Sequence, residues 1–400
     1  MLKIKMASCS SFIFIFGQLF IAASLIPFFG FSQFDSQPFP LLFAIIFIFL
    51  IKLNHKFIFP NKYLIYYLLF VITGCFLAYL TDNRFSILTI RGVAGYLGIF
   101  FYYTAFDNYI RNFGFPLRLF QAFILLWILV GIIQLFFPDF GSNFIAQRNS
   151  IGRGVTSLAP EPTHFGFFIF FSSWIILLSK KYKIDMINKL VIFIGLLSIL
   201  FLAMSSMTLL FIIFAFLFYL FYLFFKKKYL TLFILTTTLS TILIPIGVDF
   251  NDTNRILLFT TSLLSGDFSK FFSDSSVLSR FNDILFPFVA LFKNNFLPGG
   301  FSSFGKQFYI FLNLVFIPEF SEGKKIMSWT MSMWYELGFF GIFAWLSLIL
   351  INKQNITLRS FLENFYLFFI LFSAIPALFP LPAMVMTLIN YNAENYKISL

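Results

Sequence analysis

Arginine side chains are the groups of this sequence best suited to bind an anion, because one guanidinium can hold two phosphate oxygens at once. Arg84 and Arg91 are seven residues apart, so on a helix they project from one face. Arg91 is expected about one turn inside the end of an apolar helix, where a charge costs about 2.5–3.5 kcal/mol. Two interpretations stay open: Arg91 extends to the lipid headgroups, or both arginines line an anion site.

A second cluster lies in the polar segment 147–164, which carries Arg148 and Arg153 among small residues. Pro162 favours the first turn of a helix, and a helix N-terminus offers free N–H groups and a partial positive charge. Together these groups could hold a diphosphate. Glu161 stands at the same end, where it either caps the helix or assists a reaction as a base or by orienting an arginine.

A third cluster surrounds Arg280, in a stretch whose apolar residues recur at helical spacing. Arg280, Asn282 and Asp283 fall toward another side. This pattern predicts an amphipathic helix that lies on the membrane or over a helix bundle. Arg280 is then either a solvated residue or the partner of a buried anion. The apolar positions are Val277, Phe281, Ile284, Leu285, Phe288 and Phe292.

Histidine and cysteine are too few to build a metal centre. The two histidines, His55 and His164, are expected on opposite sides of a membrane, and Cys9 and Cys75 fall in or beside apolar helices. A histidine-based metal site and a disulfide framework are therefore excluded. We expect neither a metal nor a cofactor.

The elements that must position these residues are apolar helices. Hydrophobic residues make up 60% of the chain, more than a soluble domain usually carries, and they come in runs long enough to cross a bilayer. No alternating segments of the outer-membrane barrel type occur. The sequence therefore predicts an all-α, polytopic membrane helix bundle of 11 or 12 transmembrane helices, forming one integral-membrane domain over residues 1–400.

Eleven spans are predicted from the runs, and a proline-interrupted stretch, 377–392, is either a twelfth short span or a re-entrant segment. The net charge of +12 does not indicate nucleic-acid binding, because the basic residues sit between the runs. They concentrate in alternate loops, which predicts a cytoplasmic N-terminus. The predicted spans are 11–30, 39–58, 63–80, 87–107, 117–137, 163–179, 187–204, 207–225, 229–247, 328–351 and 360–376.

One long segment, 249–327, separates the last predicted spans and falls on the extracytoplasmic (periplasmic) side. It contains the amphipathic helix around Arg280, and Pro298, Gly299 and Gly300 break the chain after it. We expect a partly helical, folded cap over the outer mouth of the bundle.

Three segments carry a resemblance to a known family. The segment 153–163, with Arg153, Gly154, Glu161 and Pro162, resembles the "R-G-x-x-x-x-x-x-E-P-S" segment of Wzy-type O-antigen and capsule polymerases. The Arg280 segment followed by 298–300 is similar to a second segment of that family. The stretch 334–341 is similar to the "E-L-G-x-x-G" that opens the helix after the long outer loop in the Wzy polymerase and O-antigen ligase superfamily.

The resemblance implies a membrane-embedded glycosyltransferase of the GT-C type in the bacterial inner membrane. Its substrate would be undecaprenyl-diphosphate-linked oligosaccharide, and membrane lipid and a chain-length co-polymerase would be its partners. No nucleotide sugar and no metal would be needed. On this interpretation Arg84, Arg91, Arg148, Arg153 and Arg280 bind the diphosphate. The catalytic residues would be Glu161, Arg153 and Arg280.

Two departures from the family pattern bear on the alternatives. The stretch 325–333 lacks the histidine that ligases carry before the "E-L-G" helix, which argues against an O-antigen ligase. None of Arg148, Arg153 and Arg280 is followed eleven residues later by glycine, so that spacing assigns them no role. A polysaccharide flippase or other transporter and a scaffolding membrane protein are further alternatives. The transporter is disfavoured because the two halves show no similarity.

Overall fold

The computed structural model describes most of the chain. Arg84, Arg148 and Arg153 lie outside the described residues, as do nearly all of the predicted span 229–247 and most of the predicted loop 249–327. The described residues are 2–28, 37–54, 56–82, 86–142, 144–145, 147, 154–179, 185–228, 231, 275–301, 303–304, 326–351, 357–373 and 375–398.

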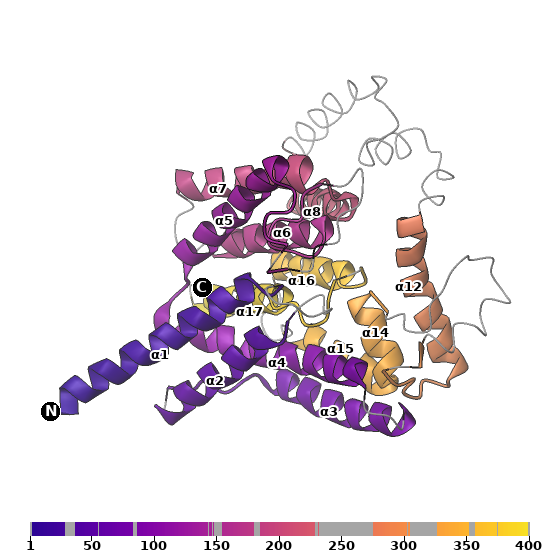
Figure 1. The fold of residues 1–400 in the computed structure, drawn as a ribbon. Helices are drawn as coiled ribbons and strands as arrows, with labels where there is room; N and C mark the ends of the chain where they lie inside the picture. Colours follow the sequence, from indigo (N-terminus) through magenta and orange to yellow (C-terminus); the bar gives the residue numbers. More distant parts are fainter. Residues whose placement is uncertain are drawn as a thin grey trace, which may run out of the picture.

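Helices are the regular secondary structure of the described residues, among which there is no strand (Figure 1). A short π-helical turn, η1, continues α7. The elements are α1 (Leu2–Leu25), α2 (Phe39–Leu53), α3 (Lys62–Asp82), α4 (Ile87–Phe113), α5 (Leu117–Phe136), α6 (Pro162–Leu178), α7 (Met186–Ser198), η1 (Ile199–Ala203), α8 (Ser206–Phe225), α12 (Ser275–Lys293), α14 (Trp329–Leu337), α15 (Phe339–Leu350), α16 (Leu358–Ile370) and α17 (Leu381–Ile398).

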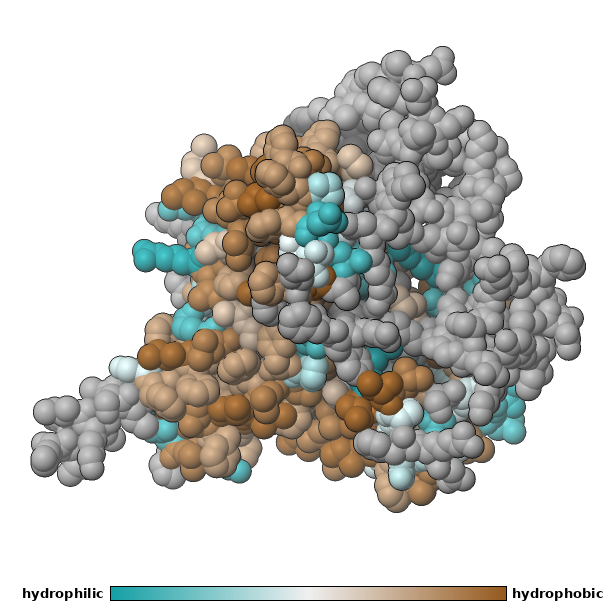
Figure 2. All heavy atoms as spheres, viewed as in Figure 1, coloured by the Kyte–Doolittle hydropathy of each residue, from teal (hydrophilic) through white to brown (hydrophobic). Residues whose placement is uncertain are grey.

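Several of these helices can cross a membrane by length and composition. Five are both long and apolar enough: α3, α4, α5, α8 and the continuous stretch Met186–Ala203. Four shorter apolar helices accompany them, in α1, α2, α6 and α15. Apolar residues also cover much of the described surface over α2, α3 and α5 (Figure 2). The prediction of a helical membrane protein is thereby confirmed, whereas the total of 11 or 12 spans and the orientation stay predictions.

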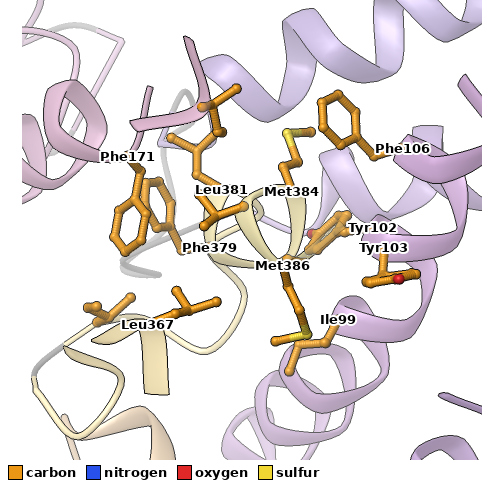
Figure 3. Close-up of a cluster of buried hydrophobic side chains, with 14 of the residues drawn as sticks. Ile99, Tyr102, Tyr103, Phe106, Phe171, Leu367, Phe379, Leu381, Met384 and Met386 are labelled. Atoms are coloured by element: carbon orange, nitrogen blue, oxygen red, sulfur yellow. The ribbon is translucent and has the colours of Figure 1, made fainter. Parts of the chain in front are cut away.

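The helix α17 forms the centre of the described bundle. It packs against α4, α6 and α16. In Figure 3, Met384 and Met386 lie beside side chains of α4, while Leu381 lies near Phe171 of α6. Because nearly all side chains of its first half are buried, α17 is a core helix rather than a peripheral one.

Contacts at both ends of α17 show that it runs parallel to α4. Just before α17 begins, Ala377 lies so close to Gly95 that a Cβ on Gly95 would sit 2.9 Å from the Cβ of Ala377. Near its other end, Glu394 accepts a 2.5 Å charged hydrogen bond from Arg111, which also donates to Asp107 over 2.8 Å. Whether 377–392 is a span or a re-entrant segment stays a prediction, because α17 is not among the described helices that are long and apolar enough to cross a membrane.

These contacts define two ends of the bundle: the Arg91 end, where α4 begins, and the Arg111 end, where α4 ends. The topology predicted from the basic residues places the Arg91 end on the periplasmic side.

The predicted continuous helix over 328–351 is wrong, because Gly338 separates α14 from α15 with φ at +61°. A segment from elsewhere inserts at this break. Phe339 N–H donates to the carbonyl of Phe296 over 2.8 Å, and the carbonyl of Tyr335 accepts from Gly299 N–H over 2.8 Å. In an unbroken helix Phe339 would donate to Tyr335. A Cβ on Gly338 would lie 2.5 Å from the Phe296 carbonyl oxygen, so glycine is needed here.

The predicted helix around Arg280 is present as α12, and part of its predicted apolar face is turned outward. Leu285, Phe288 and Phe292 are exposed, whereas Asn282 and Asp283 are buried. The face that packs on α14 is instead a stripe at spacing four, which includes Phe286 and Ala290 and contacts Met331 and Tyr335. The docking of the chain after α12 onto the break at Gly338 fixes this rotation of the helix.

Candidate functional site

A small pocket at the Arg91 end brings polar side chains of α4 and α14 together. Arg91 and Tyr96 line it from α4, and Ser332 and Glu336 from α14, while Phe301 and the segments 326–327 and 375–377 complete its wall. Its volume is about 30 Å³, room for one or two water molecules. The pocket is therefore too small in this structure for a ligand much larger than water, and a larger ligand enters only if part of the wall moves.

The carboxylate of Glu336 is the acceptor at the centre of this pocket. The hydroxyl of Tyr96 donates to its Oε2 over 2.6 Å, and the hydroxyl of Tyr67 in turn donates to the carbonyl of Tyr96 over 2.6 Å. A charge taken out of water without a partner costs several kcal/mol. Tyr96 and the nearby positive charge of Arg91 offset part of this cost.

Arg91 contributes a guanidinium whose donors are not taken up by the described residues. It interacts electrostatically with Glu336, but no hydrogen bond or ion pair joins it to another described side chain. Its five N–H donors are thus open to a ligand that enters the pocket. A positively charged side chain with open donors favours the binding of an anion.

Local sequence explains how α4 presents Arg91. Ser86 caps the helix and its hydroxyl accepts from Thr89 N–H, which sets the first turn. The next residue after Arg91 is Gly92, and a Cβ there would lie 2.4 Å from the ring of Phe301 and 3.3 Å from Oε2 of Glu336. The absence of a side chain at Gly92 lets Phe301 and Glu336 close directly onto the helix.

The wall around Phe301 is held by a turn that only glycine fits. Gly300 has φ at +87°, and a Cβ on it would lie 2.5 Å from Oδ1 of Asp82. The other carboxylate oxygen of Asp82, at the end of α3, accepts from Phe301 N–H over 2.7 Å. The hydroxyls of Ser303 and Tyr335 are hydrogen-bonded over 2.7 Å. These contacts hold residues 296–301 and Ser303 over the pocket.

Replacing Gly300 with alanine is therefore expected to loosen this wall, because the new Cβ meets Asp82 and the backbone stays in a left-handed conformation, at about 1–3 kcal/mol. We expect faster proteolytic cleavage within 294–303 of the purified protein. Asn295 is a matched control, since its φ of +52° means that Asn295→Gly relieves strain. Equal cleavage of wild type and Gly300→Ala would show that the turn does not hold the wall.

Among the predicted site residues that the structure describes, only Arg91 lines this pocket. Glu161 precedes α6 as its N-cap residue without a side-chain capping bond, and it does not line the pocket. Arg280 is half-buried on α12 and does not line it either. His164 is buried, with its ring 5.3 Å from that of Phe28. Arg84, Arg148 and Arg153 lie outside the described residues, so the structure does not test their predicted roles.

From the sequence, Glu336 was included only as part of the motif 334–341. Its position as the carboxylate nearest Arg91 was not predicted. A signal was available, because Glu336 is the single charged residue between Lys325 and Lys353. An ionisable residue inside an apolar segment marks a functional site by default. The contribution of Tyr96 and Asp82 had no comparable signal.

A second, larger cavity of about 530 Å³ lies between α6, α7, α8 and α16. It belongs to the Arg111 end, because Leu178 lines it and the carbonyl of Leu178 accepts from Asn392, close to Glu394. Its wall is mostly apolar, and its charged groups, Arg359 and Glu363, are hydrogen-bonded to each other over 2.7 Å. The pocket at Arg91 is accordingly the better candidate for chemistry.

Comparison of the chain with family models, with curated proteins and with solved structures finds no match. The functional argument therefore depends on the geometry of the site and on the sequence resemblance.

Proposed function

We propose that this chain is a membrane-embedded glycosyltransferase that polymerises undecaprenyl-diphosphate-linked oligosaccharide repeat units at the periplasmic face of the inner membrane. The observation that supports it most is the pocket at the Arg91 end. There an arginine with open donors and a buried carboxylate meet under a docked segment of the long loop. Two of the motifs behind the resemblance, 298–300 and 336–341, contact each other at this pocket, as parts of one unit.

The proposed reaction places specific demands on the site. A hydroxyl oxygen of the acceptor sugar bonds to the anomeric carbon of the donor, while the bond from that carbon to the diphosphate oxygen breaks. The leaving diphosphate gains negative charge, which a preorganised guanidinium in a water-poor pocket stabilises. Arg91 has this role in our proposal. The hydroxyl proton needs a base, and Glu336, oriented by Tyr96, provides the carboxylate.

The other arginines keep a supporting role in the proposal. A lipid diphosphate is larger than the closed pocket, so it needs further ligands when the wall opens. Arg153 and Arg280 are proposed as these ligands, with Arg84 and Arg148 beside them. Glu161 is assigned to orienting an arginine, because Glu336 is the carboxylate in the pocket. Membrane lipid and a chain-length co-polymerase are the proposed partners.

A deletion strain tests the proposal against its rivals. If the chain is the polymerase, the strain carries lipid A–core capped with a single repeat unit, and the wild-type gene restores the long-chain ladder on a polysaccharide gel. Loss of all repeats from the core, with chains left on the lipid carrier, would instead identify a ligase. Lipid-linked units accumulating on the cytoplasmic face would identify a flippase.

A further inference from the structure

The exposed side of α12 carries a continuous aromatic ridge. Phe288 and Phe292 have ring centroids 4.9 Å apart, and Phe292 and Phe296 have theirs 4.8 Å apart. Leu285 extends the ridge at one end and Leu297 at the other, and all five side chains are exposed. Exposed apolar surface of this extent marks an interaction site.

The ridge continues into the apolar surface of the helix α15. The carbonyl of Phe296 accepts from Phe339 N–H over 2.8 Å, and Phe339 opens α15, one of the shorter apolar helices. Phe339 and Phe343 are exposed on α15, and Phe343 stacks on Phe70 of α3 at 5.5 Å. The side of α12 is thus joined to an exposed apolar surface of α15.

The contact between Phe296 and α15 lies beside the apolar part of α3, before the end of that helix. Gly74 of α3 lies opposite the junction, because a Cβ on it would sit 3.0 Å from Leu337 and 3.1 Å from Phe340. Asp82, the last residue of α3, is eight residues further on, which is about 12 Å along a helix. The turn at Phe296 therefore meets α15 at the depth of the apolar part of α3.

We infer that α12 and the turn 294–297 are inserted into the lipid of the leaflet at the Arg91 end, with the ridge in contact with acyl chains. The opposite side of α12, with Phe286 and Ala290, holds α14. Phe301, which closes the pocket, follows five residues after Phe296, so lipid supports the wall of the site.

Fluorescence quenching in liposomes tests this insertion without any assay of polymerisation. Single cysteines replace Phe292 or Leu297 in a background with Cys9→Ser and Cys75→Ala, and each is labelled with bimane. Phe76→Cys, on the exposed surface of α3, is the lipid-facing control, and Asp139→Cys, exposed in the turn after α5, is the water-facing control. We expect spin-labelled phospholipid to quench the labels at 292 and 297 as strongly as the label at 76, and iodide to quench only the label at 139.

Two results would overturn the inference. Quenching of the labels at 292 and 297 by iodide, as at 139, would place the ridge in water. Protection from both quenchers would show that another protein or a second copy of the chain covers it.

Discussion

Replacing Arg91 with alanine is expected to reduce polymerisation about 100- to 1,000-fold, the loss found when one preorganised donor to a developing oxyanion is removed. Arg91 is the guanidinium with open donors beside Glu336 in the pocket. Arg91→Lys is expected to recover only part of the activity, because an ammonium cannot bind two phosphate oxygens as a planar fork. The measurement is the long-chain ladder on a polysaccharide gel, at matched protein level, in the deletion strain.

Two controls separate chemistry from folding. Arg118→Ala removes an exposed arginine at the Arg111 end and is expected to leave the ladder unchanged. Arg91→Ala leaves the carboxylate of Glu336 buried without its positive neighbour, which destabilises the fold. The double variant Arg91→Ala with Glu336→Gln removes that penalty, so it is expected to regain stability without regaining activity. A normal ladder from Arg91→Ala would contradict the role of this arginine.

The second large effect is expected at Glu336. The nearly isosteric change Glu336→Gln keeps the side-chain shape but removes the base, and we expect polymerisation to fall about 100- to 10,000-fold. Glu161→Gln is the matched variant, because Glu161 does not line the pocket, and we expect a much smaller loss. Initial rates with purified protein and lipid-linked repeat units measure both.

The opposite order of the two losses in rate would contradict the assignment of the base to Glu336. A larger loss in Glu161→Gln than in Glu336→Gln would place the base at the start of α6 and remove the pocket at Arg91 from the mechanism. Tyr96→Phe is the positioning variant. It removes the 2.6 Å hydrogen bond to Glu336 and is expected to lower the rate less than Glu336→Gln does.

Much of the helical framework could be predicted because hydrophobicity alone determines it. The predicted spans 117–137 and 207–225 differ by one residue from α5 and α8, since each is an apolar run bounded by polar or proline residues. Arg91 was placed correctly near the start of α4 on the same grounds. The order of apolar runs and charged loops is a local property of the sequence.

The parts that failed depend on contacts between distant segments. The break at Gly338 exists because Phe296 and Gly299 take the backbone hydrogen bonds of α14 and α15, and those residues are about forty positions away. The rotation of α12 depends on the same contacts, and the sequence left open whether this helix lies on the membrane or over the bundle. The sequence predicted one apolar face of α12, and the stripe with Phe286 and Ala290 that packs on α14 was not predicted.

The most direct test of the central claim is a reconstituted reaction. Purified protein in liposomes is given lipid-linked repeat units as the only sugar substrate, without nucleotide sugar, and the products are separated by size. The account predicts a ladder of increasing repeat number with wild type and with Arg118→Ala, and single units with Arg91→Ala and with Glu336→Gln. Single units from the wild-type protein, or a full ladder from both pocket variants, would contradict it.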